Sequence, residues 1–184
     1  MELKKTWNQD SYLKALRFAA EAHNGQKVPG TDLPYLMHVA AVTMEITAVI
    51  SIEGLREPDL AVQCALLHDI IEDTDVTGYD ISLLFGPKVA AGVDALTKNR
   101  CLAKDVQIRD SIIRIQKMPR EIAVVKLADR ITNLQPPPAH WDENRIKHYR
   151  RDSGIILEHL GSSSPYLAER MRFKLAGYGS GSTT

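Results

Sequence analysis

An apolar run in this sequence ends in a histidine, and four carboxylates follow within eight residues. The segment reads ALLHDIIEDTD and covers residues 65–75. Like charges one turn apart on a helix repel each other, and burying them without partners costs still more. A bound cation would offset both costs. The segment therefore predicts a positively charged partner, and a divalent metal ion is the first candidate.

Three separate predicted helices each offer a side chain of a metal-binding type in apolar surroundings. His38 interrupts PYLMHVAAV, His68 and Asp69 end CALLHD, and Asp129 interrupts VVKLADRITNL. A charged residue on a core-facing stretch is rarely left unpaired. We therefore expect these two imidazoles and two carboxylates to bind one divalent cation between the helices.

The ligand types also narrow the choice of metal. A mixed set of nitrogen and oxygen ligands with open positions suits Mn²⁺, with Fe²⁺ and Zn²⁺ as alternatives. A closed structural zinc site would use cysteines, and Cys64 and Cys101 are badly placed for that. The open positions would hold water or substrate oxygens, so the metal would lower the pKa of water and polarise a phosphorus centre.

Each candidate ligand also has an ordinary structural explanation. His38 alone is more often a satisfied core histidine than a ligand. The His68–Asp69 pair fits a helix C-terminus, where the dipole favours a histidine. Asp129 beside Arg130 fits an ion pair. The adjacent His-Asp pair, with carboxylates one turn later, favours the metal site over these alternatives.

Two further carboxylates are candidates for proton transfer. Glu72 and Asp73 follow Asp69 by three and four residues, so on one helix they lie near its face. Beside a metal they could orient or deprotonate the attacking water, or protonate a leaving group. Asn133 follows Asp129 by four residues and could bind a substrate oxygen or orient a ligand. The alternatives are a solvated acidic helix end and a polar helix C-terminus.

Helical periodicity dominates the elements that must position these residues. Asp59 and Asp80 are the predicted N-caps of the third and fourth helices. The β-branched stretch at 122–129 continues to Leu134 without turn residues, which favours a helix over a strand. The prediction is an all-α fold, a single helical bundle, with helices at 11–23, 35–51, 60–73, 81–85, 86–98, 106–118, 120–134, 145–160 and 164–178.

Composition limits the partners. The 184 residues fit one domain, expected at 1–178, and GSGSTT at 179–184 reads as a flexible tail, native or left from cloning. Lys plus Arg and Asp plus Glu both number 23, so we expect neither a nucleic-acid polymer nor a membrane as partner. No export signal or membrane span is apparent. Two cysteines without a disulfide framework fit the cytoplasm. The oligomeric state stays open.

These motifs resemble the HD-domain superfamily, which takes its name from the adjacent His-Asp pair. More closely, the chain is similar to the small alarmone hydrolases, single-domain relatives of the RelA/SpoT-type hydrolase domain. The similarity covers about residues 10–160 and includes, in order, PYLMH, ALLHDIIEDTD, LFGPKVAAGVDALTK and VVKLADRITNL. It implies an HD-domain helical bundle, one Mn²⁺, and hydrolysis of the 3′-pyrophosphate of the nucleotide alarmones ppGpp and pppGpp.

The resemblance also assigns roles by motif position. The four candidate ligands match the family's metal ligands, and Glu72 and Asp73 match its catalytic Glu-Asp pair. Asn133 matches a position near the substrate. Lys98 and Tyr149 fall near positions used for phosphate or sugar contacts. No synthetase half is present, so the resemblance implies degradation only.

Two departures from the family pattern matter, and the first concerns the choice of base. Members commonly carry an Arg-Lys pair in the loop before PY, where this chain has Val28 and Pro29, with Lys27 as the only cation. The usual proline after the first ligand histidine is Val39 here. The adenosine analogues (p)ppApp and NADPH therefore stay open as substrates.

Other classes of function remain beside this one. The same ligands would serve another HD-type phosphohydrolase, such as a nucleotidase or an NADPH 2′-phosphatase. A metal-stabilised nucleotide sensor and a plain helical interaction module are the non-enzymatic alternatives. The adjacent Glu72 and Asp73 supply acid–base groups beside one metal, and this favours the alarmone-type reaction.

Overall fold

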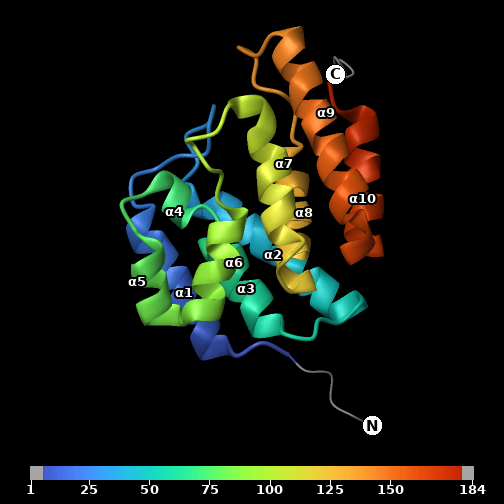
Figure 1. Ribbon diagram of the computed structural model, residues 1–184. Coiled ribbons are helices and arrows are strands. Elements are labelled where there is room, and N and C mark those ends of the chain that lie inside the picture. Colours follow the sequence, from blue (N-terminus) through green and yellow to red (C-terminus); the bar gives the residue numbers. More distant parts are fainter. Residues whose placement is uncertain (1–5, 180–184) are drawn as a thin grey trace.

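A computed structural model describes residues 6–179 as a bundle of α-helices (Figure 1). Among these residues no strand forms, and one isolated bridge joins Lys27 to Pro34. The all-α prediction is confirmed. The helices are α1 (Gln9–Ala22), α2 (Leu36–Ile52), α3 (Pro58–Leu67), α4 (Ile70–Asp73), α5 (Gly78–Phe85), α6 (Pro87–Leu96), α7 (Lys104–Ile115), α8 (Arg120–Asn133), α9 (Glu143–Leu160) and α10 (Pro165–Gly177), with a 3₁₀ turn, η1, at Gly161–Ser163.

Helix α8 forms the centre of the bundle. It is buried without interruption from Glu121 to Ile131, and it packs against α2, α3, α6, α9 and α10. Figure 1 shows α9 and α10 side by side along one flank of the molecule, with α1 and α5 on the opposite flank. A helix that is buried all round belongs to the core, so the β-branched stretch in α8 is helical, as predicted. Asp129 is thereby carried into the interior.

The predicted continuous helix at 60–73 is wrong at one point. Helix α3 ends at Leu67 and α4 begins at Ile70, and Asp69 between them has φ −102° and ψ 0°. Consecutive side chains on a regular α-helix point about 100° apart. The break instead lets His68 and Asp69 face the same point, with 2.8 Å between His68 Nε2 and Asp69 Oδ2.

Two predicted N-caps are also wrong. Helix α3 starts with Pro58 in its first turn, a position that proline's fixed φ favours. Asp59 instead accepts a hydrogen bond from the backbone of Asn8, outside the helix. In α5 the N-cap is Thr77, and Asp80 is its capping-box partner, with each side chain bonding the other residue's backbone N–H.

The predicted tail can be compared with the structure only at its first residue. Helix α10 ends at Gly177. Of the predicted tail at 179–184, all but Gly179 lies outside the described residues. Among the helices described, none combines the length and apolar character needed to cross a membrane.

Helices α3, α6 and α8 approach one another closely at Gly92. A Cβ atom at this position would lie 2.7 Å from Cys64 Sγ on α3 and 2.7 Å from Ile122 Cδ1 on α8. Both neighbours are buried core residues, so neither can move without displacing others. The close contact of these three helices therefore depends on the absence of a side chain at Gly92.

Prediction one concerns this contact. Gly92→Ala should lower the free energy of unfolding by about 1–3 kcal/mol, as overpacking does in a dense core. The matched control is Gly154→Ala on α9, where a Cβ meets nothing within 4 Å. That variant should gain about 0.5–1 kcal/mol, because alanine favours a helix over glycine. Urea denaturation measures both, and equal stabilisation of the two variants would contradict the packing.

Candidate metal centre and active site

Four side chains from three parts of the chain meet inside the bundle. His38 comes from α2, His68 and Asp69 from the junction of α3 and α4, and Asp129 from α8. Each offers one ligand atom, and the four atoms all lie within 4.8 Å of one another. The two Nε2 atoms are 3.2 Å apart. The structure thus brings together the four residues predicted as metal ligands; below they are called the His-Asp cluster.

Both imidazoles present the same nitrogen to the centre of the His-Asp cluster. His68 Nδ1 lies 2.8 Å from the carbonyl oxygen of Ala65, and His38 Nδ1 lies 3.4 Å from Thr132 Oγ1. These contacts on the outer nitrogen leave Nε2 of each ring facing Asp69 and Asp129. Metal-binding histidines are usually held in this way, with the remote nitrogen engaged by a carbonyl or hydroxyl.

The electrostatics of the His-Asp cluster suit a cation. Burial disfavours the charged form of Asp129, but Lys126 and His68 outweigh it and hold its pKa at about 2. Burial likewise opposes protonation of His68, yet Asp69 and Asp129 raise its pKa to about 9. Burial also disfavours the charged form of Asp69, but the charge of His68 and hydrogen bonds from the neighbouring side chains hold its pKa well below the usual range. Both carboxylates are therefore ionised. Buried carboxylates need a positive partner, and a divalent ion among these nitrogen and oxygen donors fits that need.

Lys126 is a cationic neighbour of the His-Asp cluster, contrary to what its place in the sequence predicts. An amphipathic lysine in an apolar run usually extends its charge to the surface, but here Nζ lies 3.1 Å from Asp129 Oδ2 and the residue is buried. The alternative ion pair between Asp129 and Arg130 is absent from the described contacts. Arg130 instead donates to Ser153 Oγ at 3.3 Å and stacks on Tyr149.

Tyr35 is a second neighbour that sequence reasoning missed. Its hydroxyl donates a hydrogen bond to Asp69 Oδ2, and its ring lies between those of His23 and His38. Burial, followed by the charge of Asp69, raises the pKa of this hydroxyl, so it stays protonated as a donor. The signal was available in PYLMH, because a side chain three residues before His38 lies on the same helical face.

The two candidate catalytic carboxylates lie on the single turn of α4. Glu72 accepts from Lys98 twice, from the backbone N–H at 3.1 Å and from Nζ at 2.7 Å. Asp73 is partly exposed, and burial, Asp69 and Glu72 together raise its pKa. Glu72 is therefore fixed in orientation, whereas Asp73 binds a proton more readily than an ordinary aspartate does.

Two long side chains hold backbone carbonyls of α4. Gln26 Nε2 donates to the carbonyl of Asp73 at 2.7 Å. Arg100 Nη2 donates to the carbonyl of Glu72 at 2.6 Å and lies 3.5 Å from Asp73 Oδ1. The backbone positions of the catalytic candidates thus depend on two loops, one after α1 and one after α6.

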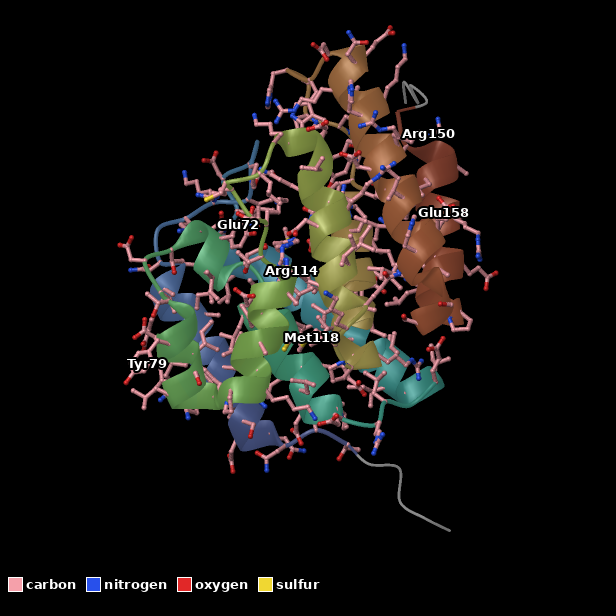
Figure 2. All side chains as sticks on the ribbon, in the orientation of Figure 1. Glu72, Tyr79, Arg114, Met118, Arg150 and Glu158 are labelled. Atoms are coloured by element: carbon pink, nitrogen blue, oxygen red, sulfur yellow. The ribbon has the colours of Figure 1, made fainter. Side chains whose placement is uncertain are left out.

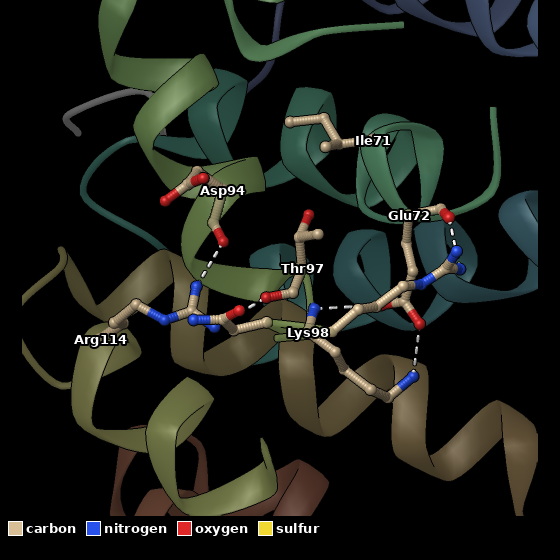
Figure 3. Close-up of a pocket in the computed structure, with 8 residues that line it drawn as sticks. Ile71, Glu72, Asp94, Thr97, Lys98 and Arg114 are labelled. Atoms are coloured by element: carbon tan, nitrogen blue, oxygen red, sulfur yellow. Dashed lines mark hydrogen bonds and ion pairs between the residues drawn. The ribbon is translucent and has the colours of Figure 1, made fainter. Parts of the chain in front are cut away.

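A cavity of about 410 Å³ opens beside Glu72. Figure 2 shows Glu72 on α4 and Arg114 on α7, and Figure 3 shows the residues that line the space between them. Three of these carry positive charge and two carry negative charge. The lining residues are Ile71, Glu72, Asp94, Thr97, Lys98, Asn99, Arg100 and Arg114. The cavity therefore adjoins the catalytic candidates and offers room for an anionic group.

The four residues predicted to contact the substrate differ in how they connect to the His-Asp cluster and to Glu72. Lys98 reaches it through Glu72, and Asn133 donates to Asp129 Oδ1, which orients that carboxylate. Tyr149 lies on α9 under the guanidinium of Arg130, 4.4 Å from its ring centre. Lys27 pairs with Asp32 at 2.7 Å on the exposed loop, and no contact joins it to the His-Asp cluster among the residues described.

Comparison with known proteins agrees with this fold and this set of side chains. The family described as HD domain matches residues 15–162, and the chain belongs to this family. Its relatives include the guanosine-3′,5′-bis(diphosphate) 3′-pyrophosphohydrolases MESH1 of Drosophila melanogaster and Homo sapiens. The fly protein is 30% identical over 167 residues, covering 88% of this chain and 91% of its own. The human protein is 30% identical over 172 residues, covering 90% and 94%.

A solved structure is similar over nearly the whole chain. It is that of a metazoan ortholog of SpoT that hydrolyses ppGpp and plays a role in starvation responses. The TM-score is 0.78 at 28% identity, covering 95% of this chain and 99% of the other. The resemblance to the small alarmone hydrolases, inferred from four sequence blocks, is confirmed.

Prediction two tests the metal. His68→Ala should weaken binding of Mn²⁺ more than tenfold, because it removes one of four converging donors; changes to residues behind the ligands already cost about 10–100-fold. The control is His159→Ala, an exposed histidine of α9. Metal content after dialysis is measured by mass spectrometry, with circular dichroism to confirm folding. Equal metal content in His68→Ala and the parent protein would remove His68 from the ligand set.

Proposed function

We propose that this protein is a metal-dependent hydrolase that removes the 3′-pyrophosphate of ppGpp and pppGpp. The observation that carries the proposal is the His-Asp cluster with Glu72 and Asp73 directly after it. Relatives matched over most of their length bear the name of this activity. The small nucleotide is the partner, and the two free cysteines fit the reducing cytoplasm in which we place the enzyme.

The His-Asp cluster would hold the metal through His38, His68, Asp69 and Asp129. Mn²⁺ is our first choice and Fe²⁺ and Zn²⁺ are the alternatives, since mixed imidazole and carboxylate donors suit all three. When bound, a divalent cation neutralises charge on the pyrophosphate and lowers the pKa of water. Tyr35 and Asn133 support this role, because each donates to one of the carboxylates and fixes its direction.

Glu72 and Asp73 divide the proton chemistry between them. Attack by water on the phosphorus attached to the 3′ oxygen breaks that P–O bond and releases pyrophosphate and a nucleoside 3′-hydroxyl. The water loses a proton and the 3′ oxygen gains one. Glu72, held by Lys98, orients the water. Asp73, whose pKa is raised by burial and two neighbouring carboxylates, accepts the proton and passes it to the leaving oxygen.

Positive charge near these groups favours a pyrophosphate substrate. Burial opposes the charge of Lys98, but Glu72, Asp129 and Asp69 raise its pKa, so it is cationic beside the His-Asp cluster. Such a charge stabilises a phosphoryl group that gains negative charge during the reaction. We assign Lys98 and Asn133 to the pyrophosphate end of the substrate, and Tyr149 and Lys27 to the rest of the nucleotide.

The loop before α2 bears on the choice of base. Lys27 bridges to Pro34 and pairs with Asp32, so its charge is partly satisfied inside the loop. Val28 and Pro29 offer no charge to a base. Relaxed selection between guanine and adenine follows from this, and (p)ppApp is therefore the second substrate that we propose, with NADPH as the competing one.

Prediction three concerns Asp73. Asp73→Asn should retain most of the metal and lose at least a hundredfold in kcat, because general acid–base groups contribute about 10²–10⁴-fold. Asp75→Asn is the control, since Asp75 is exposed two residues further on. Single-turnover hydrolysis of ppGpp measures both. Unchanged turnover in Asp73→Asn would show that another group moves the proton.

Prediction four is the test of the function itself. The pure protein with Mn²⁺ should release pyrophosphate from ppGpp, pppGpp and ppApp, and chelation with EDTA should abolish the release. Released pyrophosphate and orthophosphate are separated by ion chromatography, with NADPH in the same panel. Orthophosphate from NADPH alone would identify a 2′-phosphatase. No release from any nucleotide with Mn²⁺, Fe²⁺ or Zn²⁺ would refute the proposal.

A further inference from the structure

Arg114 on α7 joins three parts of the chain through one guanidinium. Its Nε donates to Asp110 Oδ2 at 2.9 Å, one turn earlier on the same helix. Its Nη1 donates to the carbonyl of Asp94, and its Nη2 donates to the carbonyl of Thr97 at 2.7 Å. Figure 3 shows the guanidinium directed at these two carbonyls across the cavity wall. Asp110 thus orients the guanidinium, and the two carbonyl oxygens accept its hydrogen bonds.

The two carbonyls that accept hydrogen bonds from Arg114 lie at the end of α6. Asp94 is in the last turn of this helix, and Thr97 is its C-cap, with extended φ −68° and ψ 134°. The last carbonyls of a helix lack partners within it, and a cation there interacts favourably with the helix dipole. Arg114 therefore fixes the point and direction at which the chain leaves α6. The next residue after Thr97 is Lys98.

Lys98 depends on this exit direction because it binds Glu72 with two groups at once. Its backbone N–H reaches Glu72 Oε2 and its Nζ reaches Glu72 Oε1. Such a paired contact needs the backbone of residue 98 in a fixed place. A displaced Thr97 carbonyl would move the following peptide N–H, because both belong to the same planar unit.

We propose that Arg114 is a positioning residue of the active site: by holding the Asp94 and Thr97 carbonyls it sets Lys98, and through Lys98 it sets the Glu72 carboxylate. The expected effect on kcat rests on the proposed function. The positioning of Lys98 and Glu72 by Arg114 rests only on the contacts and does not depend on that function. Arg114 contacts neither Glu72 nor the His-Asp cluster among the described contacts, so its effect passes through the peptide between residues 97 and 98.

A double-mutant cycle distinguishes positioning from a general structural effect. Arg114→Gln should lower kcat about tenfold with metal content unchanged, and Arg114→Lys, which keeps one donor group near the carbonyls, should lose about threefold. In the Lys98→Met background, Arg114→Gln should lose no more than about threefold, because the side-chain bond to Glu72 is already absent and only the backbone N–H of residue 98 still joins this peptide to Glu72. Arg109→Gln, an exposed arginine of the same helix, is the control and should leave kcat unchanged in both backgrounds.

A second measurement requires no hydrolysis. Trace acetylation with acetic anhydride, followed by peptide mass spectrometry, reports how freely the Lys98 amine reacts. We expect its rate to rise about threefold in Arg114→Gln and not in Arg109→Gln, because an amine released from Glu72 is more available. The rate at Lys147, an exposed lysine of α9, is the internal reference and should not change.

Each combination of results has a defined meaning. Equal loss of kcat from Arg114→Gln in the parent and Lys98→Met backgrounds, or an unchanged Lys98 rate, would overturn the positioning role. A raised Lys98 rate in a protein that hydrolyses no alarmone would support the positioning and refute the proposed function. If Arg114→Gln does not fold, Arg114→Lys decides by the same two measurements.

Discussion

The interaction on which the rest of the structure depends is the approach of two carboxylates and two imidazoles inside an apolar bundle. Asp69 and Asp129 lie with His38 and His68 where water is largely excluded, and all four donor atoms fit within 4.8 Å. Charges of this kind stay buried only with compensation. Lys126, Tyr35 and Asn133 supply part of it within the chain. A bound divalent ion would supply the remainder, and its binding would then stabilise the folded state.

The geometry of this centre explains a feature of the backbone that helix propensity alone would not produce. Residues 60–73 have the apolar spacing of one helix, yet the helix stops after Leu67 and restarts at Ile70. The interruption directs His68 and Asp69 to the same point and places Glu72 and Asp73 on a separate turn. The contacts between distant segments outweigh the local preference for a continuous helix. Such local departures are common where a site needs a particular backbone conformation.

Much of the fold and of the candidate site was predictable from the sequence, and two of the failures share a cause. Apolar periodicity located the helices, and the polar interruptions at His38 and Asp129 marked the interior site. Periodicity could not reveal the break at Asp69, because the break comes from contacts with α2 and α8. Tyr35 was missed for the same reason, since its partner Asp69 lies on another segment of the chain. Lys126 pairs with Asp129 three residues later on the same helix, so this contact could be predicted from the spacing. The starts of α3 and α5 follow local rules that can be read from the sequence, because proline favours the first turn of a helix at Pro58 and Thr77 with Asp80 forms a capping box.

The short helix α4 has a consequence for how such an enzyme can diverge. Two of its carbonyls are held by Gln26 and Arg100, which belong to surface loops, whereas the His-Asp cluster is built on α2, α8 and the junction that follows α3. Surface loops tolerate sequence drift and insertions better than core helices. The affinity for the metal and the turnover rate can therefore evolve partly independently. Substitutions in the loops can change the turnover rate or the preferred nucleotide, while the buried residues that would bind the metal stay the same.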